Sequence, residues 1–459
     1  MTFSRFKNIL IVFLAFIALY QTSAIWFGDT GSNLLTFFAR GRQQEVGSEL
    51  RRNFAFPMRV IAGDGSHYFR VIYSGMSTNT LVDFCDAIMV AALQRDDMPR
   101  TSPPDFRVLL EGNVLIYEYP FEMPSREFVQ ALGLQPGTLS IAIDRFNQII
   151  FSAEPYGVNI YFHNRNTGAW AGYFVSDTDI SERFKAVTEA AVQEPNQTLL
   201  WASSTLLGFN DNPYSNLFIP VWEETGHRYL IGEARPAHFD STVGAVMSVI
   251  RENVLSFFDN PAAIYNVPTV GGFAWADEST IVRHFGNNVL RYTSYRRDLR
   301  GSEFLDDFAR ALDFIASRDL LMTNDFYLSG FREHNNERVF YFEYLLDGLP
   351  VIFTDVLRYS ISEHTSSAIT VRFRDGNLVE YTRLAYELRI NPRSSDNANR
   401  DLPLYILNSG LDIEGLESIT LGFAAPRIDL AGAGSMNLWV NFRMQDGISS
   451  MESLGSTLD

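Results

Sequence analysis

Residues 339–353 read Val-Phe-Tyr-Phe-Glu-Tyr-Leu-Leu-Asp-Gly-Leu-Pro-Val-Ile-Phe, two apolar runs on either side of Asp347-Gly348. This dipeptide favours the primed turn that joins two antiparallel strands, so the stretch predicts a β-hairpin. A second hairpin is predicted by Ala368–Arg374 and Asn377–Thr382, which flank Asp375-Gly376 in the same way.

An amphipathic helix is predicted just upstream, over residues 302–318 with Ser302 as its N-cap. Its apolar face consists of Phe304, Leu305, Phe308, Leu312 and Ile315. Such a face packs against a sheet. The helix and the two hairpins together predict an α+β fold, with antiparallel sheets and helices packed on one face.

The rest of the chain alternates strand-like runs with helical patterns. Upstream strands are expected at 58–62, 67–73, 107–110, 114–119, in several runs between 140 and 175, at 216–222 paired with 227–232, and at 279–284 and 289–292. Helices are expected at about 80–94, 125–133, 181–192 and 242–258. Downstream we expect a polar surface loop at 392–402, strands at 418–423 and 437–442, and a frayed tail after Gln445.

The N-terminus has the pattern of a membrane anchor. Arg5 and Lys7 precede the apolar run Ile9–Phe27, which as a helix spans about 28 Å, close to the hydrocarbon thickness of a bilayer. Positive charge before the run orients the rest of the chain outward. We therefore predict a single-pass protein of the cell membrane with a cytoplasmic N-terminus (1–8), a transmembrane helix (9–27), a linker (28–48), and an extracytoplasmic part made of an N-terminal ectodomain (49–194), a central domain (195–298) and a C-terminal domain (299–459).

A cleaved signal peptide is the alternative interpretation of the same run. Its apolar region would be Ile9–Tyr20, and Thr22-Ser23-Ala24 would be the cleavage site. The uncleaved anchor is preferred because the apolar run resumes at Ile25-Trp26-Phe27. A cleaved chain would be a secreted binding protein, and both interpretations place the bulk of the chain outside the cytoplasm.

One face of the predicted anchor carries small residues. Ala15, Ala18 and Thr22 are three and four residues apart, and Gln21 lies beside them. Small side chains let a second transmembrane helix approach closely, and a glutamine amide can form a hydrogen bond across such a contact. These four residues are the candidate partner face, although alanine is also simply common in membrane helices.

Composition and charge exclude several classes of protein. The 459 residues include 54 acidic and 37 basic side chains, for a net charge of -17, which argues against a nucleic-acid partner. Cys85 is the only cysteine, so the chain has no internal disulfide and no cysteine-based zinc or iron–sulfur site. Its apolar surroundings predict a buried thiol.

No catalytic motif stands out. The sequence has no G-x-S-x-G, H-E-x-x-H, P-loop or dinucleotide fingerprint, and its seven histidines are scattered. Adjacent acids such as Asp306-Asp307 point to different faces of a helix. We therefore predict no enzymatic activity, no cofactor and no metal. The alternative is a cell-envelope hydrolase or carbohydrate-binding protein on the same anchor.

Four segments in succession resemble the YycH family. The resemblance is strong over about residues 280–445, and it departs from the family where Gly-Leu-Pro replaces Gly-Tyr-Pro at residues 348–350. The matching segments are the span closing in Gln21–Phe27, the turn and strand Asn288–Tyr292, the helix Ala311–Ser317 leading to Phe340–Glu343 and Asp347–Val351, and the strand Ile419–Phe423 followed by Trp439.

The resemblance implies a non-enzymatic function. YycH-like proteins are membrane-anchored accessory regulators of the YycG (WalK) sensor histidine kinase of Gram-positive bacteria, a two-component system that controls cell-wall metabolism. They fold outside the membrane as three domains, the last one resembling the partner protein YycI. The implied partners are thus a YycG-like sensor kinase and a YycI-like protein, and the implied C-terminal domain is YycI-like.

Overall fold

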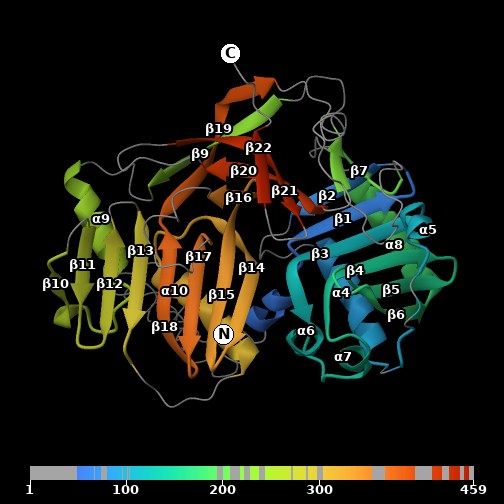
Figure 1. Cartoon of the computed structure of the whole chain (residues 1–459), viewed down its shortest axis with the longest axis horizontal. Coiled ribbons are helices and arrows are strands. Elements are labelled where there is room, and N and C mark those ends of the chain that lie inside the picture. Colours follow the sequence, from blue (N-terminus) through green and yellow to red (C-terminus); the bar gives the residue numbers. More distant parts are fainter. Residues whose placement is uncertain are drawn as a thin grey trace, which may run out of the picture.

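The computed structural model describes residues 49–66, 68–73, 80–95, 97–100, 102, 104–193, 200–206, 218–221, 228–236, 243–269, 272–285, 288–296, 303–353, 367–397, 416–425, 434–444 and 449–453. These residues form two β-sheets with helices packed against them. Figure 1 shows the first sheet with its helices on the right, in blue to green, and the second sheet on the left and at the top, in yellow to red apart from the green strand β9. The predicted α+β class with antiparallel sheets is confirmed.

The first sheet is antiparallel throughout its described strands. Its spatial order is β6-β5-β4-β3-β1-β2-β7-β8. The strands are β1 (Arg59–Asp64), β2 (Tyr68–Tyr73), β3 (Asn113–Pro124), β4 (Arg145–Glu154), β5 (Gly157–Asn164), β6 (Ala169–Ser176), β7 (Leu200–Ser203) and β8 (Phe218–Val221).

Two longer helices, α4 (Thr80–Leu93) and α8 (Thr178–Val192), cover one face of this sheet. The hydroxyl of Tyr117 on β3 donates to the main-chain oxygen of Val82 on α4 at 3.1 Å. On the same face, the ring of Phe151 on β4 lies 6.5 Å from that of Phe184 on α8. Shorter helices are α5 (Phe106–Leu110), α6 (Ser125–Ala131) and α7 (Thr138–Ala142).

The second sheet is larger and is assembled from distant parts of the chain. Its order is β10-β11-β12-β13-β18-β17-β15-β16-β20-β21-β9-β19, with β14 paired to β15 and β22 to β21. Among the described pairings of this sheet, β16 and β20 run parallel. The strands are β9 (Arg228–Pro236), β10 (Tyr265–Val267), β11 (Gly272–Ala276), β12 (Thr280–Phe285), β13 (Val289–Ser294), β14 (Asp325–His334), β15 (Glu337–Leu346), β16 (Leu349–Phe353), β17 (Ile369–Arg374), β18 (Asn377–Leu384), β19 (Tyr386–Asn397), β20 (Leu416–Ala425), β21 (Gly434–Met444) and β22 (Ser449–Ser453).

The two predicted Asp-Gly hairpins are confirmed, and so is the helix before them. Asp347 and Gly348 have φ values of 50° and 74°, and Asp375 and Gly376 have 50° and 73°. Positive φ at both central positions is the geometry that a type I′ turn requires. The helix α10 (Phe304–Arg318) begins after Glu303, one residue later than the predicted N-cap, and buries the predicted apolar face.

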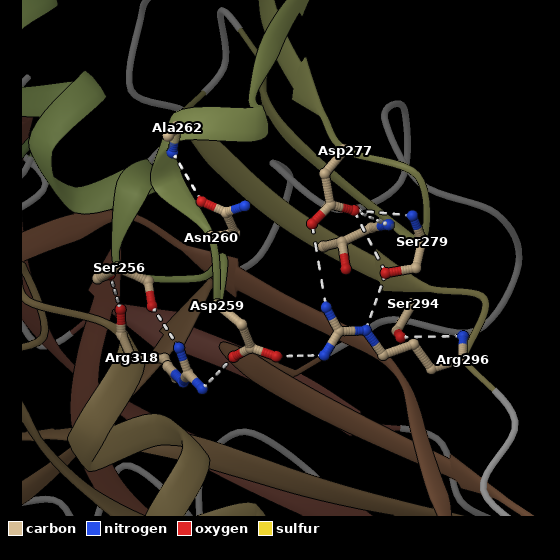
Figure 2. A network of polar contacts seen from close by, with 10 residues as sticks. Ser256, Asp259, Asn260, Ala262, Asp277, Ser279, Ser294, Arg296 and Arg318 are labelled. Atoms are coloured by element: carbon tan, nitrogen blue, oxygen red, sulfur yellow. Dashed lines mark hydrogen bonds and ion pairs between the residues drawn. The ribbon is translucent and has the colours of Figure 1, made fainter.

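A polar network connects the C-terminal ends of two helices that pack on the second sheet (Figure 2). Asp259, just after α9 (Val243–Leu255) and before the short helix η4 (Pro261–Ala263), accepts hydrogen bonds from Arg296 and, at 2.8 Å, from Arg318. Arg296 also donates to Ser279 at 2.8 Å. Because Arg318 ends α10 and Arg296 follows β13, the network links two helix ends to the sheet. The side chains of Arg296, Asp259 and Arg318 are 36% to 49% exposed, so water screens each ion pair and its contribution is modest.

The expected strand at 107–110 is wrong. Residues Phe106–Leu110 form α5, because the Asp105 side chain accepts hydrogen bonds from the N–H groups of Arg107 and Val108 at 3.1 and 3.4 Å. This N-cap outweighs the strand preference of a short apolar run. The expected strand run from residue 140 likewise begins later, at β4, because α7 occupies Thr138–Ala142.

The expected pairing of 216–222 with 227–232 is also wrong. Both strands exist, as β8 and β9, but β8 pairs with β7 in the first sheet. β9 pairs with β19 and β21 in the second sheet. Closeness in sequence favours a hairpin, and longer-range contacts decide otherwise here.

Two segments that were expected to be irregular contain strands. β19 continues to Asn397, through part of the expected loop, and a register shift between Asn391 and Ser395 accommodates Pro392, which has no N–H to donate. β22 lies within the expected frayed tail and pairs with β21. A polar composition thus does not prevent a strand where a partner strand supplies the hydrogen bonds.

The limits of the three predicted ectodomain units, at 194/195 and 298/299, stay a prediction. The strand order places β7 and β8 with the strands of the N-terminal unit and β9 to β13 with those of the C-terminal unit.

Candidate functional site

A buried row of side chains crosses six neighbouring strands of the first sheet. Each member lies directly opposite the next in strand register, on the face away from α4 and α8. Each is at most 8% exposed. In spatial order from β2 to β6 the row is Tyr73, Arg59, Glu118, Gln148, His163 and Trp170.

Glu118 holds the negative charge at the centre of this row. Its carboxylate accepts hydrogen bonds from Arg59 and, at 2.8 Å, from the amide of Gln148. Arg165 adds an ion pair at 3.3 Å. Burial by itself raises the pKa of Glu118, but the two guanidinium groups outweigh it and hold the pKa below its ordinary value. The carboxylate is therefore ionised and fully engaged at neutral pH.

His163 completes the polar part of the row as a neutral ring. The Gln148 amide nitrogen donates to Glu118, so its oxygen accepts from His163 Nδ1 at 3.0 Å. The imidazole stacks on Trp170 with 3.8 Å between ring centroids. Burial, with the charge of Arg165 adding to it, lowers the pKa of His163 to about 3. With Nδ1 protonated, Nε2 is left as an acceptor that has no hydrogen-bond partner within the described residues.

Arg59 connects the row to the second sheet. Its guanidinium bonds to Glu118 and Tyr73 within the first sheet. Its Nη1 donates to the main-chain oxygen of Ile419 on β20 at 2.8 Å. The guanidinium also lies 6.0 Å from the centroid of the Trp201 ring. The charges of Arg59 and Glu118 are thus paired, which suits a structural connection and offers no free nucleophile or proton donor.

Aromatic rings fill the seam, which we define as the contact region between the two sheets. Phe121 of the first sheet lies edge-on to Phe331 of the second at 5.4 Å. Phe54 packs against both rings. These aromatic contacts form a well-packed, apolar interface between the first sheet with its helices, which we call the first half of the molecule, and the second sheet with its helices, which we call the second half.

The adjacent acids Asp306 and Asp307 do not converge on one site. Asp307 is buried and accepts from Arg338 at 2.8 Å, whereas its neighbour Asp306 pairs with Arg51 on the surface. Cys85 is fully buried, as predicted, and burial raises the pKa of its thiol. Among the described residues, no group of three His, Cys, Asp or Glu side chains is placed to hold a metal ion.

An open pocket of about 640 Å³ lies beside the edge strand β10 and its neighbour β11. A catalytic pocket of the kind that the hydrolase alternative requires would have converging carboxylates, and the lining of this one contains none. Its lining residues are Arg251, Asn266, Val267, Pro268, Thr269, Gly272, Phe273, Ala274 and Trp275.

The predicted partner face, Ala15, Ala18, Gln21 and Thr22, lies outside the described residues, as does the whole predicted anchor 9–27. Within the described residues, no helix has both the length and the apolar character to cross a membrane. The structure therefore adds the buried row and the seam to the candidate residues but places none of the four.

The buried row was not identified from the sequence. Its members are far apart along the chain, and only strand register brings them together. One local signal exists: Glu118 is a charged residue inside the apolar strand run Val114–Tyr119. Charged residues are almost never fully buried unless they are paired, so such a position indicates a buried partner without identifying it.

The comparisons with known proteins concern the fold. The structure is similar to that of YycH from Bacillus subtilis, with a TM-score of 0.51, 10% sequence identity, and coverage of 89% of this chain and 98% of that chain. A match to the C-terminal domain of YpeB from Bacillus megaterium has a TM-score of 0.24 and 10% identity, and covers 47% of this chain and 98% of that chain. No protein family and no curated protein matches the sequence. The resemblance indicated by the sequence motifs is thus confirmed at the level of structure: this chain has a YycH-like fold.

Proposed function

We propose that this protein is a membrane-anchored, extracytoplasmic regulator of a two-component sensor histidine kinase that controls cell-wall metabolism. The similarity to YycH over 89% of the chain is the observation that carries the proposal. The apolar run Ile9–Phe27 supports it, because it supplies the anchor that such a regulator needs. The proposed partners are a YycG-like kinase and a YycI-like protein, and the C-terminal unit is proposed to be YycI-like.

The proposed mechanism is a population shift in the kinase. A transmembrane helix that packs better against one state of the kinase favours that state, by no more than the difference in its affinity for the two states. Ala15, Ala18 and Thr22 would allow close helix contact, and Gln21 would form a hydrogen bond across it. The protein would act by contact and would not transform a substrate.

The test enlarges side chains on the candidate partner face of the anchor helix and, as a control, on its opposite side. The double variant Ala15→Leu/Ala18→Leu is expressed in full length with the kinase, and the kinase recovered from detergent-solubilised membranes is quantified. We expect recovery to fall, because the larger side chains hold the helices apart. Ala24→Leu is the control, a single substitution of the same kind, since at about 100° per residue it lies on the opposite side of the helix from Ala15.

Two outcomes would count against the proposal. One is equal recovery of the kinase with the double variant and with wild-type protein. The other is an intact-mass measurement showing that the mature chain has lost its first 24 or so residues, as the signal-peptide alternative predicts.

A further inference from the structure

Residues 49–56, which we call the entry segment, are the first described residues after the predicted linker. They are held by the first half of the molecule. Arg52 donates to Asp83 and to Asp86 on α4, both at 3.1 Å. The main-chain oxygen of Ala55 accepts the hydroxyl of Tyr119 on β3 at 2.8 Å. The side of the segment that faces the first sheet is thus fixed by both charge and hydrogen bonding.

The same segment is also held by the second half. The ring of Phe54 lies 5.1 Å from Phe304 and 5.3 Å from Phe308, both edge-on and both on α10. It lies 6.0 Å from Phe331 on β14. Next to it, Arg51 pairs with Asp306 on the first turn of α10. Contacts to both halves therefore come from neighbouring residues of one short stretch.

Phe54 is fully buried, although it lies close to the predicted linker. A void as large as a phenylalanine ring costs free energy, because the residues that line it lose their van der Waals contacts. If the ring leaves the seam, the two sheets recover part of that loss by closing on each other. The contacts that remain across the seam, including Phe121 with Phe331 and Arg59 with Ile419, would act as a pivot about which such a movement takes place.

We propose that the entry segment is a wedge whose docking sets the orientation of the two sheets relative to each other. Displacing it changes that orientation, and through it the surface that the ectodomain offers to a partner. We take the membrane anchor as the source of this displacement, and this part of the proposal rests on the proposed function. The part in which the wedge sets the orientation of the sheets does not rest on it.

The test measures the distance between the two halves in the full-length protein. Spin labels are attached to cysteines introduced at Ile141 on α7 and at Leu320 just after α10, which are 77% and 59% exposed. The single native cysteine, Cys85, is buried and stays unlabelled. Distance distributions from electron–electron double resonance are compared for wild type, Phe54→Leu and Phe54→Ala.

We expect a narrow distance distribution for wild type. In the variants the distribution should shift or broaden, and this change should be larger for Phe54→Ala than for Phe54→Leu. The matched control is Phe162→Ala, an equally buried ring whose aromatic neighbours Phe128, Phe146 and Tyr173 all belong to the first half. This variant should leave the distance unchanged. Because Phe54→Leu keeps an apolar side chain, it remains informative where Phe54→Ala does not fold.

The proposal is overturned if Phe54→Leu and Phe54→Ala leave the distribution unchanged, or if Phe162→Ala alters it as much as they do. The measurement requires no kinase. If the kinase does not co-purify but the Phe54 variants change the distance, the proposed function is wrong and the wedge proposal stands. If the kinase co-purifies but the Phe54 variants leave the distance unchanged, only the wedge proposal is wrong.

Discussion

Arg59 on β1 donates from Nη1 to the main-chain oxygen of Ile419 on β20, at 2.8 Å and across 360 positions of sequence. The same guanidinium neutralises Glu118 on the neighbouring strand β3. A hydrogen bond from an ionised donor is stronger than a neutral one, and burial strengthens it further. One side chain thus satisfies a buried charge in the first sheet and joins that sheet to the second.

Replacing Arg59 by Met should destabilise the protein by about 3–5 kcal/mol, because it leaves the buried Glu118 with only part of its compensation. The free energy of unfolding from urea titration of the full chain measures this. Arg107→Ala removes an exposed i,i+4 ion pair with Glu111 and is the control, expected to change stability by less than about 1 kcal/mol.

A second variant separates charge from packing. In Arg59→Met/Glu118→Gln the buried carboxylate charge is gone, and Arg165, 14% exposed, is the charge that loses its partner there, so part of the lost stability should return. If the double variant is no more stable than Arg59→Met alone, the destabilisation comes from lost packing or from the lost bond to Ile419, and the charge argument is wrong.

Glu343 on β15 should make stability fall as pH rises. Its carboxyl group accepts the N–H of Ala368 at 3.1 Å, and Tyr327 lies opposite it on β14. Burial raises the pKa of Glu343 to about 8, well above the ordinary value of about 4.3. Between these two values the folded state binds more protons than the unfolded state, so the free energy of unfolding decreases by up to about 1.4 kcal/mol per pH unit.

The variant Glu343→Gln tests this contribution, because glutamine can still accept from Ala368 and cannot ionise. Unfolding free energies at pH 5 and pH 8 are compared for the two proteins. The variant should lose less stability than wild type between these pH values. An identical pH dependence would mean that Glu343 is ionised in the folded protein at neutral pH.

The turn at Gly348 should tolerate alanine poorly for a purely conformational reason. Its φ is 74°, and a Cβ added there would meet nothing within 4 Å. Gly348→Ala should therefore cost about 1–2 kcal/mol from left-handed backbone strain alone. Gly112→Ala is the control, since Gly112 is not among the positive-φ glycines and its added Cβ would have its nearest contact at 3.7 Å. Equal costs at both sites, measured by urea unfolding, would contradict the strain argument.

Cys85 should be unreactive in the folded protein. Its side chain is fully buried, and the raised pKa of the thiol disfavours the reactive thiolate. A chromogenic disulfide reagent should titrate essentially no thiol under native conditions and one thiol per chain in guanidinium chloride. Rapid reaction of the native protein would show that α4 opens from the sheet.

Local sequence patterns determined the hairpins and the long helices. Asp347-Gly348 and Asp375-Gly376 form their predicted turns because positive φ is a property of the residues at the turn itself. The apolar stripe of α10 identified both the helix and its buried face, because helical periodicity is visible within a few turns. The α+β class follows from these elements alone.

Tertiary structure alone decided how the strands are shared between the sheets and which residues make the buried row and the seam. β8 and β9 are neighbours in sequence but belong to different sheets. Arg59 meets Glu118 only because β1 pairs with β3 in one register, and it meets Ile419 only because β20 arrives beside it. A strand carries its alternation of faces within its own sequence, but its partner depends on loop closure and packing over the whole chain, which no short segment encodes.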